Sequence, residues 1–290
     1  MIDTSSWPRP SLLLILAAAI GAVLLAVVAV MWWPQFGDEH AYWTAAQRLV
    51  AGQPLYDPGA PANQPFAYWY PPVLAQVLAP FTLFVPAPVF TVVWTVLLVA
   101  CVWWLAGRNV FVALALIAFL PVALELRVRN VHLLIAVLTV LALRRSWVFW
   151  IPAVAIKIGP LVGPVYLLAA GRWREAVLVG VAGLAVVVVS VALAPAAWLG
   201  FIDIATGRAG SDAGGWFGIP YSARLGAGVI LAALAGRRGG RGGEIALVIA
   251  ILVANPTLWA NSLSLLLAII PLSRQTEAPR VTEDPRVAAA

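Results

Sequence analysis

Residues 11–31 read SLLLILAAAIGAVLLAVVAVM, an apolar run without a charged side chain. A helix that crosses the hydrocarbon core of a bilayer needs about 20 consecutive apolar residues. The run is too long for the core of a signal peptide, and no small-residue cleavage site follows it. We therefore expect a retained first membrane-spanning helix.

The composition of the rest of the chain is that of a polytopic membrane protein. Hydrophobic residues make up 63% of the 290 residues and charged residues only 10%, which no soluble domain of this size matches. The further apolar runs cover residues 71–106, 110–124, 131–143, 147–171, 175–197, 224–236, 244–254 and 257–272. We predict an all-α membrane protein with about ten crossings.

Two of the long runs are interrupted by proline. The interrupting residues are Pro80, Pro86 and Pro88 in the run 71–106, and Pro152, Pro160 and Pro164 in the run 147–171. Broken or re-entrant helices are tolerated in a membrane only where protein or a wet cavity covers the exposed backbone. The breaks therefore favour a protein with an internal site over a simple anchor.

Net charge is +6, with seventeen arginines and a single lysine. The arginines fall in short loops between apolar runs, the pattern of membrane topology signals, so nucleic-acid binding has little support. Placing these loops in the cytoplasm puts segments 34–70, 125–130 and 198–223 outside. We expect residues 1–272 to form one transmembrane domain and the polar segment 273–290 to be a disordered cytoplasmic tail.

The first outer loop opens with Gly37-Asp38-Glu39. Asp38 is well placed as a helix N-cap, Glu39 would lie in the first turn, and Gly52 would stop the helix. Apolar residues then repeat at helical spacing, at Tyr42, Ala45, Ala46 and Leu49. This pattern predicts a short amphipathic helix on the membrane surface.

Asp38 has two compatible interpretations. It caps the helix, and a partly desolvated carboxylate at the membrane boundary can also act as a general base toward a hydroxyl. Glu39 would point about 100° away on the helix. We expect it to be solvated or paired with an arginine, or to contact a substrate.

Lys157, the only lysine, lies inside an apolar run beside Gly159-Pro160. A cation in such a segment is costly and usually faces a cavity or a partner. One interpretation is an interfacial lysine that snorkels from a short broken helix. The other is a cation that binds the phosphate of an anionic lipid headgroup.

Polar side chains gather between two predicted spans, at Glu125, Arg127, Arg129, Asn130 and His132. Arg127 and Arg129 would lie outside, against the positive-inside rule, and either bind phosphate or belong to a solvated turn with a Glu–Arg pair. His132 is either a hydrogen-bonded core histidine or a member of the site.

Later polar residues carry weaker signals. Asp203, Arg208, Asp212 and Arg224 are in or beside the last outer loop, which either covers a site or is simply solvated. Trp259, Asn261 and Ser262 either line a cavity or pack helices. Tyr70 and Arg224 are candidate donor or acceptor contacts.

Common soluble motifs are missing from the sequence. There is no Walker loop, dinucleotide fingerprint, zinc spacing or nucleophile elbow, and the single Cys101 excludes a disulfide framework or a thiolate metal site. We expect no metal and no cofactor. An activated donor would have to arrive through the membrane.

The pattern as a whole resembles glycosyltransferase family 87. The matching first-loop residues are Asp38, Tyr42, Ala45-Ala46, Gly52, Leu55-Tyr56 and Tyr70-Pro71-Pro72. Lys157-Ile158-Gly159-Pro160, followed by the basic loop Arg172-Trp173-Arg174, and Asn255-Pro256 with Trp259 are similar to later family segments, so that the resemblance spans roughly 35–272. Where the family commonly shows Gly-Gln-x-Asn, this chain has Arg129-Asn130-Val131-His132.

The resemblance implies a GT-C-like helical bundle that uses polyprenyl-phosphate sugars, typically mannose. Asp38 would be the catalytic aspartate in the first extracytoplasmic loop, and Lys157 would lie near the donor phosphate. The acceptor would be a glycolipid or lipoglycan hydroxyl outside a bacterial plasma membrane. The Ala-, Val-, Gly- and Arg-rich composition suggests a high-GC bacterium, and the resemblance is to the actinobacterial type.

Two other classes stay open at this stage. Broken helices are also typical of transporters, here a lipid or sugar flippase, although no internal repeat is evident and the ionisable groups cluster at one face. The short spans and the altered stretch 129–132 would also suit a noncatalytic partner that binds a lipid-linked sugar.

Overall fold

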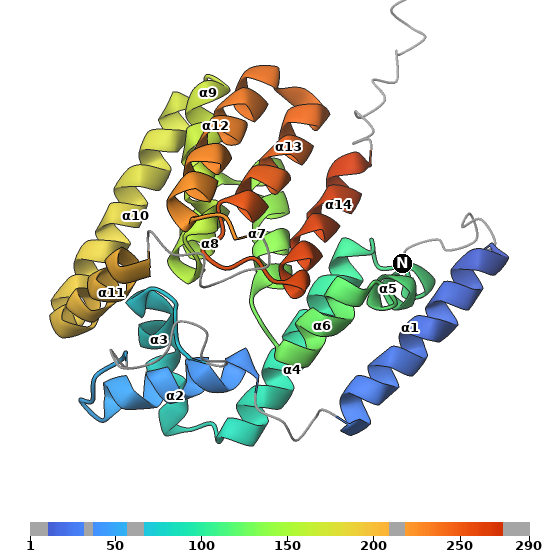
Figure 1. The fold of residues 1–290 in the computed structure, drawn as a ribbon, viewed down its shortest axis with the longest axis horizontal. Helices are drawn as coiled ribbons and strands as arrows, with labels where there is room; N and C mark the ends of the chain where they lie inside the picture. The colour runs from blue at the N-terminus through green and yellow to red at the C-terminus, as the bar shows by residue number, and fades with distance from the viewer. Residues whose placement is uncertain (1–10, 32–36, 57–66, 209–217, 275–290) are drawn as a thin grey trace, which may run out of the picture.

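The computed structural model describes residues 11–31, 37–56, 67–208 and 218–274, and their regular structure is helical. Within these ranges there are fourteen α-helices and four short 3-10 helices (Figure 1). The predicted all-α class is confirmed. The predicted tail falls almost wholly outside the described residues, and so does part of each of the two long outer loops.

The first half of the chain contains the helices α1 (Leu12–Met31), α2 (Asp38–Val50), α3 (Pro72–Leu78), η1 (Ala79–Leu83), α4 (Ala87–Leu105), α5 (Val110–Ile117), α6 (Leu120–Val128) and α7 (His132–Arg144). The second half contains η2 (Trp147–Phe149), α8 (Trp150–Ile156), η3 (Gly159–Leu161), α9 (Val162–Ala169), α10 (Trp173–Leu193), α11 (Pro195–Arg208), α12 (Tyr221–Arg238), α13 (Gly240–Val253), η4 (Ala260–Ala268) and α14 (Ile269–Ser273).

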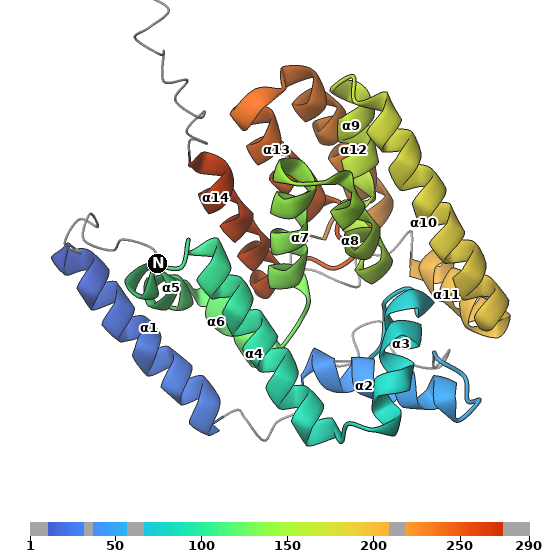
Figure 2. The ribbon, with the colours of Figure 1, turned by 180° about the vertical axis from the view of Figure 1, so that it is seen from behind.

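The helices pack around α7 and η4. The α12–α13 hairpin packs against α9, while α10 covers the outer side of α9. At the opposite edge α1 packs on α5, and α2 lies crosswise beneath the upright helices, against α3, η1 and α4 (Figures 1 and 2). Because α6 and α7 both contact η4, the junction between α6 and α7 lies at the centre of the molecule.

The proline-broken runs divide into consecutive helices, as the sequence predicts. The first run divides into α3, η1 and α4, and Pro86 stands directly before α4. The second divides at Lys157 and Ile158, between α8 and the 3-10 turn that contains Pro160. A proline lacks the amide hydrogen that a helix interior needs, so it is accommodated in a first turn or at a break.

Gly159 shows why the second break is packed so closely. A Cβ atom at Gly159 would come within 3.0 Å of the carbonyl oxygen of Ile251, and it would also collide with the side chain of Asn255. The end of α13 therefore lies directly against the break. Only a residue without a side chain leaves room for this approach.

The length and composition of several helices are those of a membrane protein. By length and composition α4 and α10 are each able to cross a membrane, and α5 with α6, bent by 82°, form a third candidate within the described residues. Several shorter apolar helices accompany them. Most of α10 exposes apolar side chains such as Val181, Leu184 and Val188, a surface that suits lipid. The described residues thus contain two or three candidate membrane spans, fewer than the predicted ten or so crossings.

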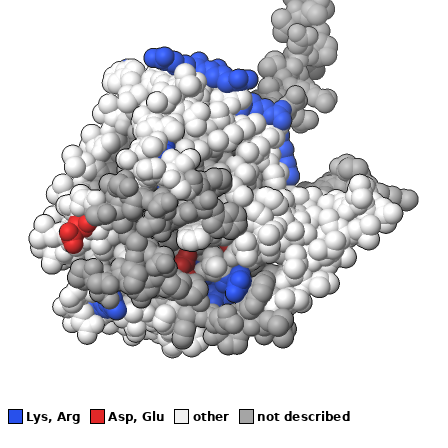
Figure 3. All heavy atoms as spheres, in the orientation of Figure 1, with Lys and Arg blue, Asp and Glu red and all other residues white. Residues whose placement is uncertain are grey.

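Charged side chains are unevenly spread. Basic side chains gather along the upper edge of the molecule, near the α12–α13 connection, where Arg237 and Arg238 end α12 (Figure 3). The acidic side chains visible on this face lie in its lower half. Further basic side chains lie in the lower half of the same face, beside the acidic ones, and the orientation stays a prediction.

Two local predictions are corrected. Asp38 is the first residue of α2 and Gly37 is its N-cap, which makes no side-chain capping bond, so Asp38 does not cap the helix. The helix ends at Val50, close to the predicted stop at Gly52, whose φ is +66°. The predicted outer loop 198–223 contains most of α11, because the apolar pattern continues at helical spacing past residue 197.

Candidate active site

The start of α2 meets the end of α6. Gly37 makes this approach possible, because a Cβ atom there would lie 2.6 Å from the carbonyl oxygen of Val128. Arg129 then adopts a left-handed conformation, with φ 52° and ψ 43°, and ends α6. The turn places Asn130 beside Asp38 although 92 positions separate them in the sequence.

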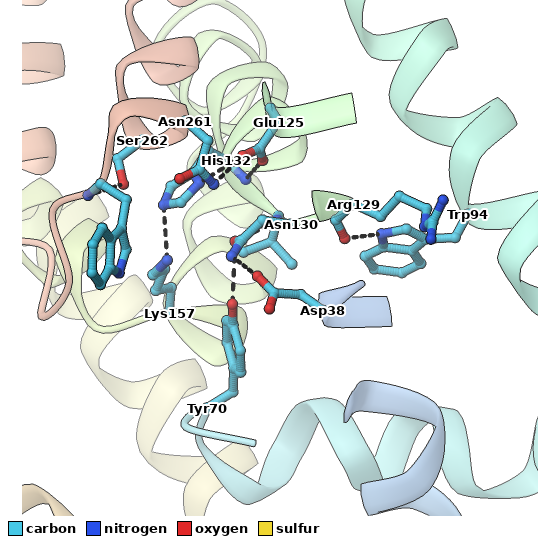
Figure 4. Close-up of polar contacts among 12 residues, drawn as sticks. Asp38, Tyr70, Trp94, Glu125, Arg129, Asn130, His132, Lys157, Asn261 and Ser262 are labelled. Carbon is cyan, nitrogen blue, oxygen red and sulfur yellow. Dashed lines mark hydrogen bonds and ion pairs between the residues drawn. The ribbon is translucent and has the colours of Figure 1, made fainter. Parts of the chain in front are cut away.

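A hydrogen-bonded chain fixes the Asp38 carboxylate (Figure 4). The side-chain amide of Asn130 donates to Oδ2 of Asp38. Its carbonyl oxygen accepts from the Tyr70 hydroxyl at 3.1 Å and from the Val131 amide at 2.6 Å. Because Oδ1 of Asn130 already has two donors, its NH2 group must be the one that faces the carboxylate.

Tyr70 has a second partner on α2. The Tyr42 hydroxyl donates to the Tyr70 hydroxyl at 3.0 Å, and the two rings meet edge to face. Burial, with the neighbouring Asp38 charge, raises the pKa of Tyr70 well above its ordinary value, so the phenol stays a neutral donor. In the chain Tyr42–Tyr70–Asn130–Asp38 each group therefore donates a hydrogen bond to the next, and the Asp38 carboxylate is the last acceptor.

The surroundings of Asp38 weaken its acidity. Burial raises the pKa of its carboxyl from 3.8 to about 7, against the lowering effects of the Lys157 charge and the Asn130 hydrogen bond. Asp38 is still partly exposed at the surface of α2. A carboxyl group with a pKa near neutrality is suited to accept a proton from a hydroxyl and to release it again.

Lys157 lies on the other side of Asn130, at the break between α8 and η3 (Figure 4). Its backbone is extended and its side chain is almost fully buried, with 5% of the residue exposed. The ammonium lies 2.8 Å from Nε2 of His132 and 5.5 Å from the centre of the Tyr70 ring. The break thus brings the only lysine of the chain to the network that contains Asp38.

Behind Lys157 lies a second hydrogen-bonded chain. Nδ1 of His132 lies 3.1 Å from Oε2 of Glu125, and the His132 backbone amide donates to Oε1 at 2.6 Å. Asn261 of η4 donates to Oε2 at 2.7 Å. Glu125, His132 and Asn261 are all buried, so these bonds replace the water that the carboxylate has lost.

A comparison with protein-family models matches residues 68–282, most of the chain, to glycosyltransferase family 87. The chain belongs to this family. No curated protein and no solved structure matches it.

The family membership makes the protein a membrane glycosyltransferase. The matched range contains most of the polar network just described, and Asp38 lies before it. The fold joins the two parts, through the contact between Asp38 and Asn130. A glycosyltransferase requires a sugar donor and an acceptor, and this network is the polar centre of the described structure.

Glu39 and Arg129 form a buried ion pair on the side that faces α4. Nε of Arg129 lies 2.8 Å from Oε1 of Glu39, and the two side chains are 2% and 1% exposed. The indole of Trp94 donates to the Arg129 carbonyl at 2.9 Å, and the Arg129 side chain extends away from Asp38 (Figure 4). The expected pairing of Glu39 with an arginine is confirmed. The structure gives no support to Arg129 as a phosphate ligand, or to Glu39 as a substrate contact, in this glycosyltransferase.

Arg224 is also held by the protein. Its guanidinium donates to the carbonyl oxygens of Asn255 and Pro256, at 2.6 and 2.7 Å. These bonds tie α12 to the connection that follows α13. Arg224 therefore has the contacts of a structural residue, and the expectation that it contacts a substrate finds no support here.

The other candidates are dispersed. Arg127 is exposed on the last turn of α6, and Asp203 is exposed on α11. Asp212 and the side chain of Arg208 fall outside the described residues. Trp259 is half exposed, and its amide is bound by the hydroxyl of buried Ser262 at the start of η4. In the described ranges no group of three or more histidine, cysteine or acidic side chains is arranged to hold a metal ion.

The sequence analysis did not predict three of the hydrogen bonds in this network. It did not identify Asn130 as the partner of Asp38, the Tyr42 hydroxyl as a donor to Tyr70, or Asn261 as a donor to Glu125. Asn130 and Asn261 lie far along the chain from the groups they bind, and no local pattern signals such contacts. The placement of Tyr42 at an apolar helical position concealed its hydroxyl.

Proposed function

We propose that this glycosyltransferase moves a sugar, mannose by family resemblance, from a polyprenyl-phosphate donor to a hydroxyl group of a glycolipid or lipoglycan. The reaction would take place at the outer face of a bacterial plasma membrane, and the complete bundle would contain about ten crossings. The observation that carries the proposal is the meeting of Asp38, Asn130 and Lys157 at one place.

Asp38 is the proposed general base. Its carboxylate is oriented by Asn130 and remains partly exposed, so that an acceptor hydroxyl can approach it. The raised pKa, about 7, makes it a stronger base than an ordinary aspartate. Asp38 would take the hydroxyl proton as the oxygen forms its bond to the anomeric carbon.

Lys157 is the proposed phosphate ligand. As the bond between the anomeric carbon and the phosphate oxygen breaks, both electrons of that bond go to polyprenyl phosphate, which leaves with an added negative charge. A fixed cation in a site of low dielectric stabilises such charge more than it does in water. The buried Lys157 ammonium supports this role. Arg127, which is exposed on α6, remains a candidate ligand of the donor phosphate.

The proposed mechanism inverts the anomeric centre, since the acceptor displaces the phosphate in one step. The polyprenyl-phosphate donor takes the place of a nucleotide sugar. Protein cations would stabilise the leaving phosphate, so the proposed mechanism needs no metal ion. His132 and Tyr70 support the two ionised groups through the chains described above. No specific observation favours a flippase or a noncatalytic partner over this function.

The decisive experiment replaces Asp38 by asparagine. Membranes that contain the full-length protein would be incubated with labelled polyprenyl-phosphate mannose and a membrane-lipid acceptor extract, and the labelled glycolipid would be measured. General-base catalysis contributes about 10²- to 10⁴-fold, and we expect Asp38→Asn to lose transfer by that factor. Asn130 can still donate to the new side chain, so the fold is retained.

The matched control is Asp203→Asn, which makes the same chemical change at an exposed carboxylate of α11. It should retain full transfer. Equal activity of Asp38→Asn and wild type would overturn the base assignment. Movement of labelled lipid across proteoliposomes by a wild-type protein that transfers no sugar would instead indicate a flippase.

A further inference from the structure

The second polar chain has a fixed direction. Glu125 accepts from the His132 backbone amide and from Asn261, and its Oε2 also faces Nδ1 of His132. A carboxylate has only acceptor sites, so Nδ1 of His132 must carry a proton and donate it. In a neutral imidazole this leaves Nε2 as an acceptor, and Nε2 is the atom that faces the Lys157 ammonium at 2.8 Å.

This direction determines how Lys157 is held. One of its three ammonium protons is directed to Nε2 of His132. The ammonium also lies over the Tyr70 ring, whose hydroxyl belongs to the chain that orients Asp38. A lysine side chain is long and flexible, and without such a partner its charge would occupy many positions.

The break in the helix makes an external partner necessary. The extended backbone at Lys157 separates α8 from η3, so the side chain does not lie along the surface of a regular helix. Its fixed polar contact comes from α7, through His132, and His132 is bonded to Glu125 of α6. Glu125 in turn accepts from Asn261 of η4. Three separate elements thereby fix one cation.

We propose that His132 is a positioning residue for the glycosyl transfer, which holds the Lys157 ammonium beside Asp38 and Tyr70 so that it meets the phosphate of a prenyl-linked donor. Glu125 and Asn261 act one step further back, by fixing the ring orientation and tautomer of His132. This inference rests on the proposed function of Lys157 as phosphate ligand. It assigns to His132 a contact with Lys157 and none with the substrate.

Two amide substitutions separate the contact of His132 with Lys157 from its side-chain contact with Glu125. In His132→Gln the side-chain oxygen reaches the position of Nε2 and can accept from Lys157, while the side-chain contact with Glu125 is lost and the backbone bond to it remains. In His132→Asn the amide reaches the position of Nδ1 and can donate to Glu125, while the contact with Lys157 is lost. If His132 acts through Lys157, glutamine should retain function. If it acts only through its side-chain bond to Glu125, asparagine should retain it.

The test measures binding of farnesyl phosphate, a short prenyl monophosphate, to the purified full-length protein in detergent, with farnesol as the uncharged probe. We expect His132→Gln to bind farnesyl phosphate within about threefold of wild type and His132→Asn to bind it about tenfold more weakly, the effect of one lost charge-assisted hydrogen bond. Farnesol affinity should be equal in all three proteins, because it lacks the phosphate.

Equal farnesyl phosphate affinity of His132→Asn and wild type would overturn the proposal, and so would stronger binding by asparagine than by glutamine. If both variants fail to fold, Asn261→Ala replaces them: a two- to threefold weaker affinity, on the order of a partial loss of one hydrogen bond, supports the proposal, and an unchanged affinity overturns it.

Failure of the proposed function gives a different result. A wild-type protein that transfers no sugar from any polyprenyl-phosphate donor, yet shows the glutamine and asparagine difference in farnesyl phosphate binding, would retain the positioning role of His132 in a binding protein. Intact sugar transfer without that difference would remove the positioning role and leave the glycosyltransferase reaction in place.

Discussion

Charged side chains on the two sides of the turn between α6 and α7 have different kinds of partner. On the side of α4, Glu39 and Arg129 contact each other directly and are both buried. On the side of α8, Asp38 and Lys157 are joined to the protein through neutral intermediaries, Asn130 and His132. Among the ion pairs of the described residues, none joins Asp38 to Lys157 directly.

The difference separates a structural from a chemical use of charge. A direct ion pair places each charge against its counter-charge and joins two segments of the chain, whereas charges held through neutral groups can still respond to a substrate. Asp38 and Glu39 are neighbours on α2, and Asn130 and Arg129 are neighbours at the end of α6. The same two segments thus provide one pair of each kind, and five experiments can distinguish the two kinds.

The largest expected effect concerns the direct ion pair. Arg129→Met leaves the Glu39 carboxylate buried without its cation, and we expect it to lower the free energy of unfolding by about 3–5 kcal/mol. The double variant Glu39→Gln with Arg129→Met buries no charge and should recover much of this loss. Unfolding in detergent measures both.

Arg145→Met makes the same change at an exposed arginine and should alter stability by less than about 0.5 kcal/mol. An Arg129→Met protein that unfolds like wild type but no longer binds farnesyl phosphate would restore Arg129 as a phosphate ligand and break the comparison.

Lys157→Met should have the next largest effect, on transfer. Methionine has nearly the length of lysine and no charge, so it removes the cation without leaving a large void. Removal of one preorganised group that stabilises developing charge typically costs about 10²- to 10³-fold, and we expect that loss in kcat/KM for the polyprenyl-phosphate donor. A loss below threefold would show that Lys157 does not serve the donor.

The pH dependence should follow Asp38. A general base must be ionised, and the pKa of Asp38 is raised to about 7 by burial, against the effect of Lys157. Transfer should therefore be half-maximal near pH 7 and fall about tenfold for each unit below it. A profile that stays flat down to pH 5 would contradict the proposed base.

The same group predicts an effect on stability, and its sign is the reverse of that for an ion-paired aspartate, whose pKa is lowered in the folded protein. Between 3.8 and about 7 the folded protein retains a proton that the unfolded chain has lost, so this group makes the protein less stable as pH rises through that window. Asp38→Asn removes the group. Its unfolding midpoint should exceed that of wild type by a margin that grows from pH 4 to 7 and is constant above.

The smallest expected effect belongs to the tyrosines that orient Asn130. Tyr70→Phe removes a hydroxyl that donates to Asn130 at 3.1 Å, and the loss of one such bond costs about 0.5–1.5 kcal/mol, or roughly two- to tenfold in transfer. Tyr42→Phe is the matched variant, and it should cost less because Tyr42 reaches Asn130 only through Tyr70. A larger loss for Tyr42 would show that the chain does not act through Asn130.

Features that depend on neighbouring residues could be predicted from the sequence. Pro86 and Pro160 restrict the backbone where they stand, and the helix boundaries around them follow. The apolar spacing of Tyr42, Ala45 and Ala46 predicts a helix with one buried face, and α2 has all three buried. Asp38 and Lys157 were recognisable because a charged group is rare in such a composition.

Features that depend on distant partners could not be predicted. The sequence pattern gives Arg127 and Arg129 the same residue type and nearly the same position, yet one is exposed and the other is paired with Glu39. Two residues of α-helix turn the side chain by about 200°, and the left-handed end of α6 turns it further, so the two arginines face different surroundings. The interpretation of Asp38 as an N-cap was wrong for a similar reason, since Gly37 is needed for close contact with Val128.

By itself the sequence determined an all-helical membrane protein with proline-broken helices, a carboxylate at the start of a short helix, and a single lysine within an apolar run. These follow from local sterics and from the cost of charge in an apolar environment. Only the tertiary structure decided which charges meet: it placed Asp38 against Asn130, Lys157 against His132, and Glu39 against Arg129. The physical reason is that hydrogen bonds and ion pairs act over a few ångströms in space, and the sequence does not state which distant residues the packing of α2, α6, α7 and α8 brings that close.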